Sequence, residues 1–149
     1  MTEFVVDRRH FNHATLVSLL AAAAATAPNG ATSARQASGT PARRDIIRQT
    51  LPGEPPRDLS LVEVTYPPGI GSSPHLHANG VMAFVVSGTV ASKVGDGPEQ
   101  IFHAGDAWWE PPGAIHRVSR NASSTEPATL LAIYVAARGA AETDLMKPV

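Results

Sequence analysis

The sequence contains no cysteine, and this absence removes two classes of structure at once. No disulfide can form and no zinc site can be built on thiolate sulfur, so any bound metal must be held by nitrogen or oxygen atoms. An excess of charge of one sign is also missing, because 12 Lys and Arg residues are matched by 13 Asp and Glu residues. A chain this close to neutral has no electrostatic case for binding nucleic acid, and we expect none as a partner.

Apolar runs long enough to span a bilayer are absent as well. The Ala- and Leu-rich uncharged run from Ala14 to Ala27 has 14 residues, whereas a membrane-spanning helix needs about 20. That length suits the apolar core of a signal peptide, and residues 25–27 and 32–34 offer the small side chains that a signal peptidase requires. An Ala-rich amphipathic helix packed on the domain is the alternative for this segment.

The charged residues just before this run resemble a twin-arginine export signal. Arg8, Arg9 and Phe11 match that pattern, whereas Asp7 departs from it. The resemblance implies that residues 1–34 are a signal segment and linker, that export machinery is a partner, and that the mature protein is periplasmic or secreted. Because twin-arginine cargo crosses the membrane folded, a metal could be loaded in the cytoplasm, where iron or manganese need not compete with the copper and zinc that affinity alone favours.

Residues 45–138 have the pattern of short strands separated by Pro- and Gly-rich turns. Residues 59–66 alternate apolar and polar side chains, which is typical of a strand with one buried face. Residues 81–86 are apolar on both faces, and such a strand is usually covered on both sides by a second sheet or a second subunit. No helical periodicity follows residue 45, so we expect an antiparallel sandwich or barrel, with residues 139–149 as a loose C-terminal tail.

Histidines are the chemically distinctive residues of this predicted domain. His75 and His77 are two residues apart, so on an extended strand both imidazoles point to the same face and supply half of a metal site. Residues 69–88 (Gly, then His-x-His, then Gly) resemble the first motif of the cupin superfamily, and residues 105–116 resemble the second. Both motifs in this order imply an all-β cupin jelly-roll β-barrel, a double-stranded β-helix, in which His116 is the third histidine of the site.

Two positions depart from the cupin motifs. Val81 stands where the first motif usually has Glu, and Arg120 stands where the second motif ends in Asn. A divalent ion held by three neutral imidazoles keeps a charge of about +2, rather than about +1 with the glutamate, so we expect such a site to favour an anionic ligand and to lower the pKa of bound water. Loss of the glutamate also leaves a metal-free barrel as an alternative.

The resemblance implies a divalent metal ion on His75, His77 and His116, with iron or manganese favoured and zinc or nickel as alternatives. Three-histidine iron sites occur in cupin dioxygenases that act on thiols, diketones and some phenolic acids. We therefore expect a metal-dependent, dioxygenase-like enzyme acting on a small organic molecule. The alternative is a non-catalytic module that binds a metal or metabolite for sensing or sequestration. Small cupins commonly dimerise through sheet faces, which agrees with the apolar residues 81–86 and predicts a homodimer.

The walls of the expected pocket come from two predicted strands. If Val81 occupies the glutamate position, then Val81, Ala83 and Val85 point inward and leave space for a compact apolar or aromatic ligand. Trp108 and Glu110 share one face of their strand. If that face is inward, Trp108 lines the pocket and Glu110 is a general base, or a carboxylate returned to the site from another strand. The alternative places Glu110 at the rim of the barrel.

Overall fold

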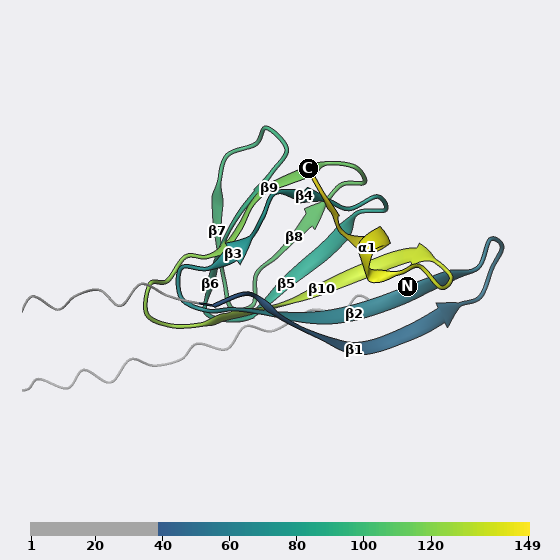
Figure 1. Ribbon diagram of the computed structural model, residues 1–149, viewed down its shortest axis with the longest axis horizontal. Coiled ribbons are helices and arrows are strands. Elements are labelled where there is room, and N and C mark those ends of the chain that lie inside the picture. The colour runs from purple at the N-terminus through teal and green to yellow at the C-terminus, as the bar shows by residue number, and fades with distance from the viewer. Residues whose placement is uncertain (1–38) are drawn as a thin grey trace, which may run out of the picture. The chain divides into compact units, whose positions relative to one another are not determined.

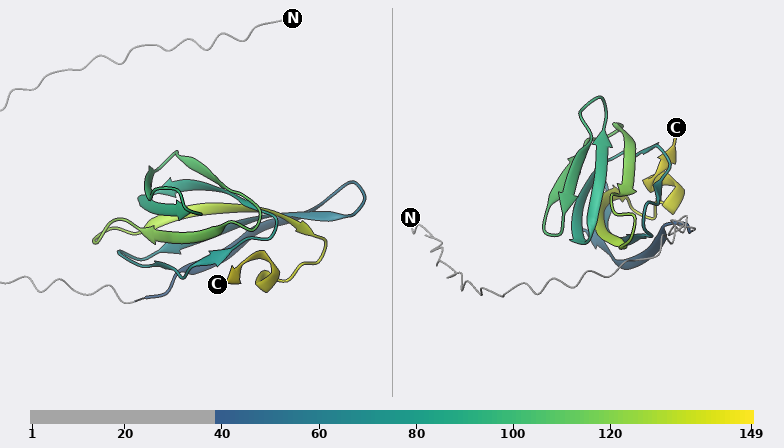
Figure 2. Two further views of the ribbon diagram at one scale, coloured as in Figure 1. Left: turned by 90° about the horizontal axis from the view of Figure 1, so that it is seen from above. Right: turned by 90° about the vertical axis from the view of Figure 1, so that its left-hand side faces the viewer.

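The structure, a computed structural model, describes residues 39–149 as two antiparallel β-sheets that face each other (Figures 1 and 2). The sheet orders are β1-β2-β10-β5-β8 and β11-β4-β9-β6-β7, and β3 pairs with β9. The strands are β1 (Ala42–Leu51), β2 (Arg57–Tyr66), β3 (Gly71–Ser72), β4 (His75–Leu76), β5 (Val81–Ser87), β6 (Thr89–Val94), β7 (Gln100–His103), β8 (Ala107–Glu110), β9 (Ile115–Asn121), β10 (Ala128–Ala137) and β11 (Lys147–Pro148). The expected export signal, with Arg8 and Arg9, lies outside the described residues.

Alternating side chains place the core between the two sheets. In β2, Val62, Val64 and Tyr66 are buried while the residues between them are half-buried, and β10 alternates in the same way along its length. This follows from the strand geometry, in which successive side chains point to opposite faces. Val90 of β6, in the second sheet, packs into the same core. The all-β, two-sheet architecture expected from the sequence is confirmed.

Asn121 ties the end of β9 to neighbouring loops. Its side chain is fully buried, and its amide nitrogen donates to the backbone carbonyls of Tyr66, Pro67 and Glu126. The amide oxygen accepts from the N–H of Ser123. A buried polar group whose donors and acceptor all have partners stabilises one chain path, so this asparagine fixes the strand that carries the third histidine.

The two ends of the domain differ from the sequence-based expectation. Strand β1 begins at Ala42, three residues before the expected start of the domain at residue 45, so Arg43 lies on a strand. The expectation that residues 139–149 form a loose tail is wrong. In the structure, α1 (Glu142–Leu145) buries Leu145 in the core and β11 pairs with β4. Helix α1 and strand β11 are too short to show a periodicity in the sequence. Between residues 39 and 149, no helix is long and apolar enough to cross a membrane.

Candidate metal centre

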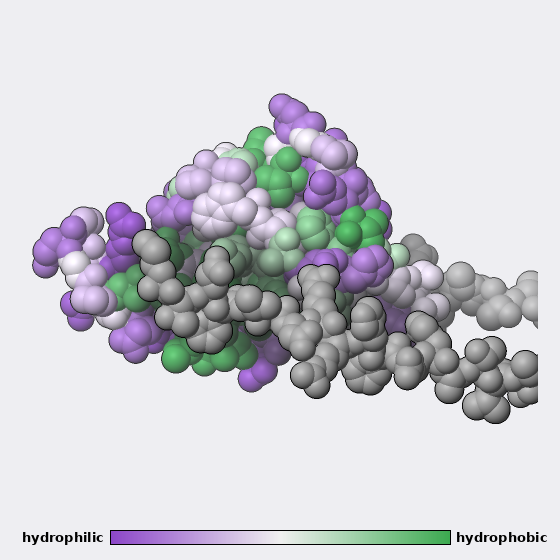
Figure 3. All heavy atoms as spheres, turned by 180° about the vertical axis from the view of Figure 1, so that it is seen from behind, coloured by the Kyte–Doolittle hydropathy of each residue, from purple (hydrophilic) through white to green (hydrophobic). Residues whose placement is uncertain are grey.

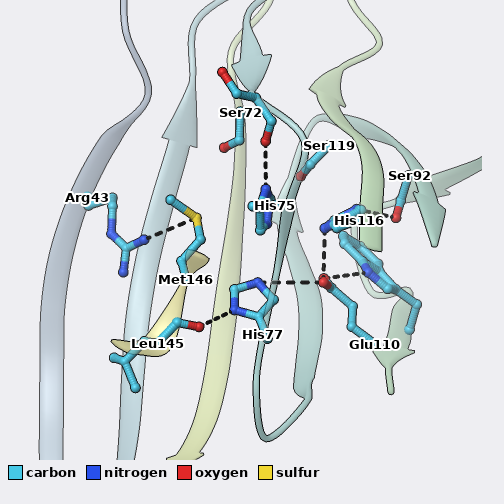
Figure 4. Close-up of polar contacts among 12 residues, drawn as sticks. Arg43, Ser72, His75, His77, Ser92, Glu110, His116, Ser119, Leu145 and Met146 are labelled. Carbon is cyan, nitrogen blue, oxygen red and sulfur yellow. Dashed lines mark hydrogen bonds and ion pairs between the residues drawn. The ribbon is translucent and has the colours of Figure 1, made fainter. Parts of the chain in front are cut away.

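Four buried polar side chains converge between the sheets. His75 lies on β4, His77 follows in the next turn, Glu110 ends β8, and His116 lies on β9 as the cross-strand partner of His75. None of the four is more than 5% exposed. The ring of His75 lies 4.9 Å from that of His77 and 5.1 Å from that of His116, centroid to centroid. The structure therefore brings the three predicted histidines together, and Figure 4 shows Glu110 beside them.

Backbone carbonyl groups fix the tautomers of His75 and His77. Nδ1 of His75 lies 2.7 Å from the carbonyl oxygen of Ser73, and Nδ1 of His77 contacts the carbonyl oxygen of Leu145. A carbonyl oxygen only accepts, so each Nδ1 carries the proton and each Nε2 presents a lone pair. Burial is the largest influence on both imidazoles and lowers their pKa, which favours the neutral form that a metal requires.

Glu110 places a carboxylate beside these lone pairs. Its Oε2 lies 3.6 Å from Nε2 of His77 and 3.0 Å from Nδ1 of His116, while Oε1 accepts a hydrogen bond from the Trp108 indole. Oε2 is buried and neither approach aligns as a hydrogen bond. Burial, the largest influence, raises the pKa of this carboxyl group, but His116, His77 and Trp108 together lower it below its usual value. Glu110 therefore points inward as a carboxylate and does not lie at the rim.

This carboxylate reaches the site from a different strand than the cupin motif uses. Val81 of β5 and Glu110 of β8 are directly opposite each other in the antiparallel pair. Cross-strand partners share a face, with Cβ atoms about 4.5–5.5 Å apart. Glu110 therefore supplies an acid beside the position where the motif has one. The expectation of a site with neutral imidazoles alone is therefore wrong. With one carboxylate among the ligands, the net charge of a bound divalent ion and its ligands would be about +1.

The donor set fits a divalent cation. One ligand atom each from His75, His77 and Glu110 lies within 4.8 Å of the other two. His77 Nε2 and Glu110 Oε2 are both electron-rich and buried, so they repel each other unless a positive charge lies between them. Imidazole nitrogen and carboxylate oxygen are suitable donors for iron, manganese, zinc and nickel.

Ser92 on β6 is a contact of the third histidine that sequence reasoning missed. Its Oγ lies 2.8 Å from Nε2 of His116, and both side chains are buried. If the hydroxyl accepts from Nε2–H, Nδ1 presents a lone pair toward Glu110; if it donates, Nδ1 carries the proton, although its 3.0 Å approach to Oε2 is not aligned as a hydrogen bond. The hydroxyl can therefore support His116 with or without a metal. One serine in a strand carries no signal of this contact, which joins β6 to β9.

A cavity of about 710 Å³ adjoins the four side chains, all of which line it. Val81, Ala83 and Trp108 line it as expected, whereas Val85 is buried in the core and is not among the lining residues. Small-molecule sites typically measure about 300–1,000 Å³, so a compact organic ligand fits this space. The cavity is largely apolar away from the histidines, where its walls include Val64, Tyr66, Leu130, Ala132 and Tyr134.

Comparison with known proteins agrees with this architecture. Residues 62–134 match the family described as Cupin domain. A Klebsiella pneumoniae subsp. pneumoniae MGH 78578 structure, described as an uncharacterized conserved protein with double-stranded beta-helix domain, is 26% identical with a TM-score of 0.55; the match covers 72% of this chain and 85% of that one. No curated protein matches the chain.

A second solved structure shows a likeness of fold alone. It is described as the DMSP lyases RdDddP and RnDddQII, is 21% identical and has a TM-score of 0.51. The match covers 61% of this chain but only 44% of that one, so this chain spans less than half of that protein. The family match includes both histidine motifs, and the two sheets enclose the histidines as a double-stranded β-helix. The described domain therefore has the cupin fold, and residues 62–134 match the cupin family.

Proposed function

We propose that His75, His77, Glu110 and His116 hold a divalent metal ion and that the protein is a metal-dependent enzyme acting on a small organic molecule. The observation that carries this proposal is the 3.6 Å approach of Glu110 Oε2 to His77 Nε2, without a hydrogen bond, in a buried site. Burying a carboxylate oxygen without a partner is unfavourable, and Oε2 has none among the described residues. A cation is the partner that satisfies both atoms.

Iron or manganese is the metal we favour, with zinc or nickel as the alternatives, since mixed nitrogen and oxygen donors suit all four. Such an ion would supply Lewis acidity, and iron or manganese would also support dioxygenase-like chemistry with an organic substrate and oxygen. The protein's own part is orientation. The Trp108 indole holds Oε1 of Glu110, so that Oε2 is directed toward the histidines. The apolar walls keep water away from a bound molecule.

Metal analysis of the full chain, purified from cells supplied with all four metals, tests the site. We expect about one divalent ion per chain, and little metal in Glu110→Gln or His77→Gln. His103→Gln is the matched control, because His103 is an exposed residue on β7. A folded wild-type chain without metal would contradict the proposal, as would full metal content in Glu110→Gln.

Oxygen consumption then separates the enzyme from a non-catalytic binding module. The metal-loaded chain is offered small diketones, thiols and phenols, and the His103→Gln and Glu110→Gln variants are measured beside it. We expect uptake of oxygen in the wild type and in His103→Gln, and none in Glu110→Gln. A metal-loaded chain that turns over none of them would support the binding module.

We also propose that the outer face of the first sheet is a homodimer interface. Met82, Phe84 and Val86 alternate with the inward residues of β5 and are exposed, and Trp109, the cross-strand partner of Met82, is 53% exposed. Figure 3 shows several separate groups of apolar side chains among polar ones on the face turned to the viewer. An apolar patch of this kind marks an interaction site, and a second copy of the chain can cover it in a two-fold arrangement.

We propose export by the twin-arginine route, on the basis of Arg8 and Arg9 before the apolar run that ends at Ala27. Cell fractionation tests this. The wild-type chain should accumulate outside the cytoplasm, and a variant with both arginines changed to lysine should remain inside. Equal export of the two forms would contradict the twin-arginine route.

A further inference from the structure

Arg43 places a fixed positive charge in the wall of the cavity. The residue lies on β1, and its side chain is 23% exposed. Among the described residues that line the cavity, Arg43 is the single Lys or Arg. Figure 4 shows its guanidinium directed toward Met146, on the side of the site that carries His77. The next residue, Arg44, is exposed and pairs with Glu63 outside the cavity.

The contact of Arg43 with the protein's own carboxylate is a weak one. Oε1 of Glu142 lies 2.9 Å from Nε of Arg43, but this buried nitrogen has no well-aligned hydrogen bond. The Glu142 side chain is 69% exposed. Ion pairs with an exposed partner contribute little stability. A carboxylate on a molecule inside the cavity could therefore take the place of Glu142.

Tyrosine hydroxyl groups accompany the guanidinium. Tyr134 lines the same cavity. Burial raises the pKa of Tyr134 to about 12, and the charge of Arg43 is the next influence and opposes the rise. The phenol is therefore neutral at physiological pH and can donate a hydrogen bond to an anion. Tyr66 adds a second phenol to the wall, hydrogen-bonded to the hydroxyls of Ser72 and Ser119.

We propose that the cavity binds an organic carboxylate, with Arg43 holding the carboxylate group and the metal centre facing the rest of the molecule. The second half of this statement rests on the proposed function, whereas the first half does not. A planar guanidinium binds a carboxylate through two parallel hydrogen bonds, which a neutral amide cannot match. Between the two ends, Val64, Leu130 and Ala132 give the cavity an apolar wall, so the ligand has an apolar body.

Calorimetric titration with matched ligand pairs tests this assignment. The metal-loaded full chain is titrated with benzoate and benzamide, and with hexanoate and hexanamide. We expect each carboxylate to bind about tenfold more tightly than its amide, because charge-assisted hydrogen bonds are roughly twice as strong as neutral ones. Arg43→Gln should abolish that preference and Arg43→Lys should keep part of it. Glu142→Gln should tighten carboxylate binding, since it removes the competing group.

Arg44→Gln is the matched control, because it removes the same charge from the adjacent residue outside the cavity. It should leave all the affinities within twofold of wild type. Equal binding of acids and amides, no binding of either acid, or equal losses in Arg43→Gln and Arg44→Gln would overturn the inference. Metal analysis of the same samples distinguishes the two proposals. If the chain holds no metal but still prefers carboxylates over amides through Arg43, only the metal centre is overturned. If the chain holds metal but shows no such preference, only the carboxylate site is overturned.

Discussion

The two halves of the candidate metal centre are held by different kinds of partner. His75 and His77 form the main-chain half, because their Nδ1 atoms contact the backbone carbonyls of Ser73 and Leu145. A substitution changes a side chain and leaves the carbonyl in place. The orientation of these two imidazoles is therefore protected against most single changes around them.

Glu110 and His116 form the side-chain half. The Trp108 indole donates to Glu110, and the Ser92 hydroxyl contacts His116. Each of these partners can be removed by one substitution. Groups that orient metal ligands typically alter affinity about 10- to 100-fold when they are lost. We therefore expect single substitutions of the supporting residues to change metal affinity in the side-chain half but not in the main-chain half.

Moving the acid between strands should have the largest effect. We expect Glu110→Val to weaken metal binding at least about 100-fold, because a charged ligand is lost. The double variant Val81→Glu with Glu110→Val should recover most of that loss, since the two positions are cross-strand partners on one face. Competition with a fluorescent chelator measures the dissociation constants. A double variant that binds no better than Glu110→Val would show that the carboxylate works only from β8.

Removing one supporting side chain should have a smaller effect. Ser92→Ala and Trp108→Phe should each weaken metal binding about tenfold. Ser73→Ala is the matched control in the main-chain half, because it retains the carbonyl that holds His75, and it should change the affinity less than twofold. The same chelator competition applies. Equal losses in Ser73→Ala and Ser92→Ala would remove the distinction between the halves.

Acid should destabilise the metal-free chain through the main-chain half. Burial lowers the pKa of His75 and His77 from 6.5, so below that pH the unfolded chain binds protons that the folded chain does not. The contribution of the two imidazoles to the free energy of unfolding is therefore fully present above about pH 6.5. It is lost as the pH falls through the lower pKa values of the folded chain. Thermal unfolding of chelator-treated protein should show a falling Tm, and a smaller fall in His75→Gln with His77→Gln. The same fall in this variant and in wild type would assign the effect to other groups.

Changes on the outer face of the first sheet should affect metal binding least. Trp109→Ser with Phe84→Ser leaves the inward face of β5 and β8 intact, so the metal affinity should stay within twofold of wild type. If that face is the dimer interface, analytical ultracentrifugation should show a shift from dimer to monomer. A monomeric wild-type chain would contradict the homodimer, and a large loss of metal would show that the two faces are coupled.

The resemblance to the two cupin motifs predicts the barrel and the three histidines, because each motif is a short local pattern of residues. The position of Glu110 does not follow in this way. Pro111 and Pro112 interrupt the alternation between Glu110 and His116, so the inward face of β8 is set by its register with β5. That register is a long-range property, and one sequence does not contain it.

Contacts between distant segments are the other part that the sequence leaves open. Arg43 contacts Met146, which lies 103 residues further along the chain, and His77 contacts Leu145, which lies 68 residues further along. Each contact depends on how the two ends of the domain return to the cavity. Short elements such as α1 and β11 have too few residues to form a sequence pattern that would predict where they pack.

The opposition of Val81 and Glu110 bears on how metal-binding cupins are recognised from sequence. A pattern that demands Glu four residues after the second histidine rejects this chain, although its cavity contains a buried carboxylate. Because cross-strand partners share a face, an acid at either position can meet the same chemical need. A search that treats the two positions as one would recover barrels whose acid lies on the neighbouring strand, and would separate them from barrels in which both positions are apolar.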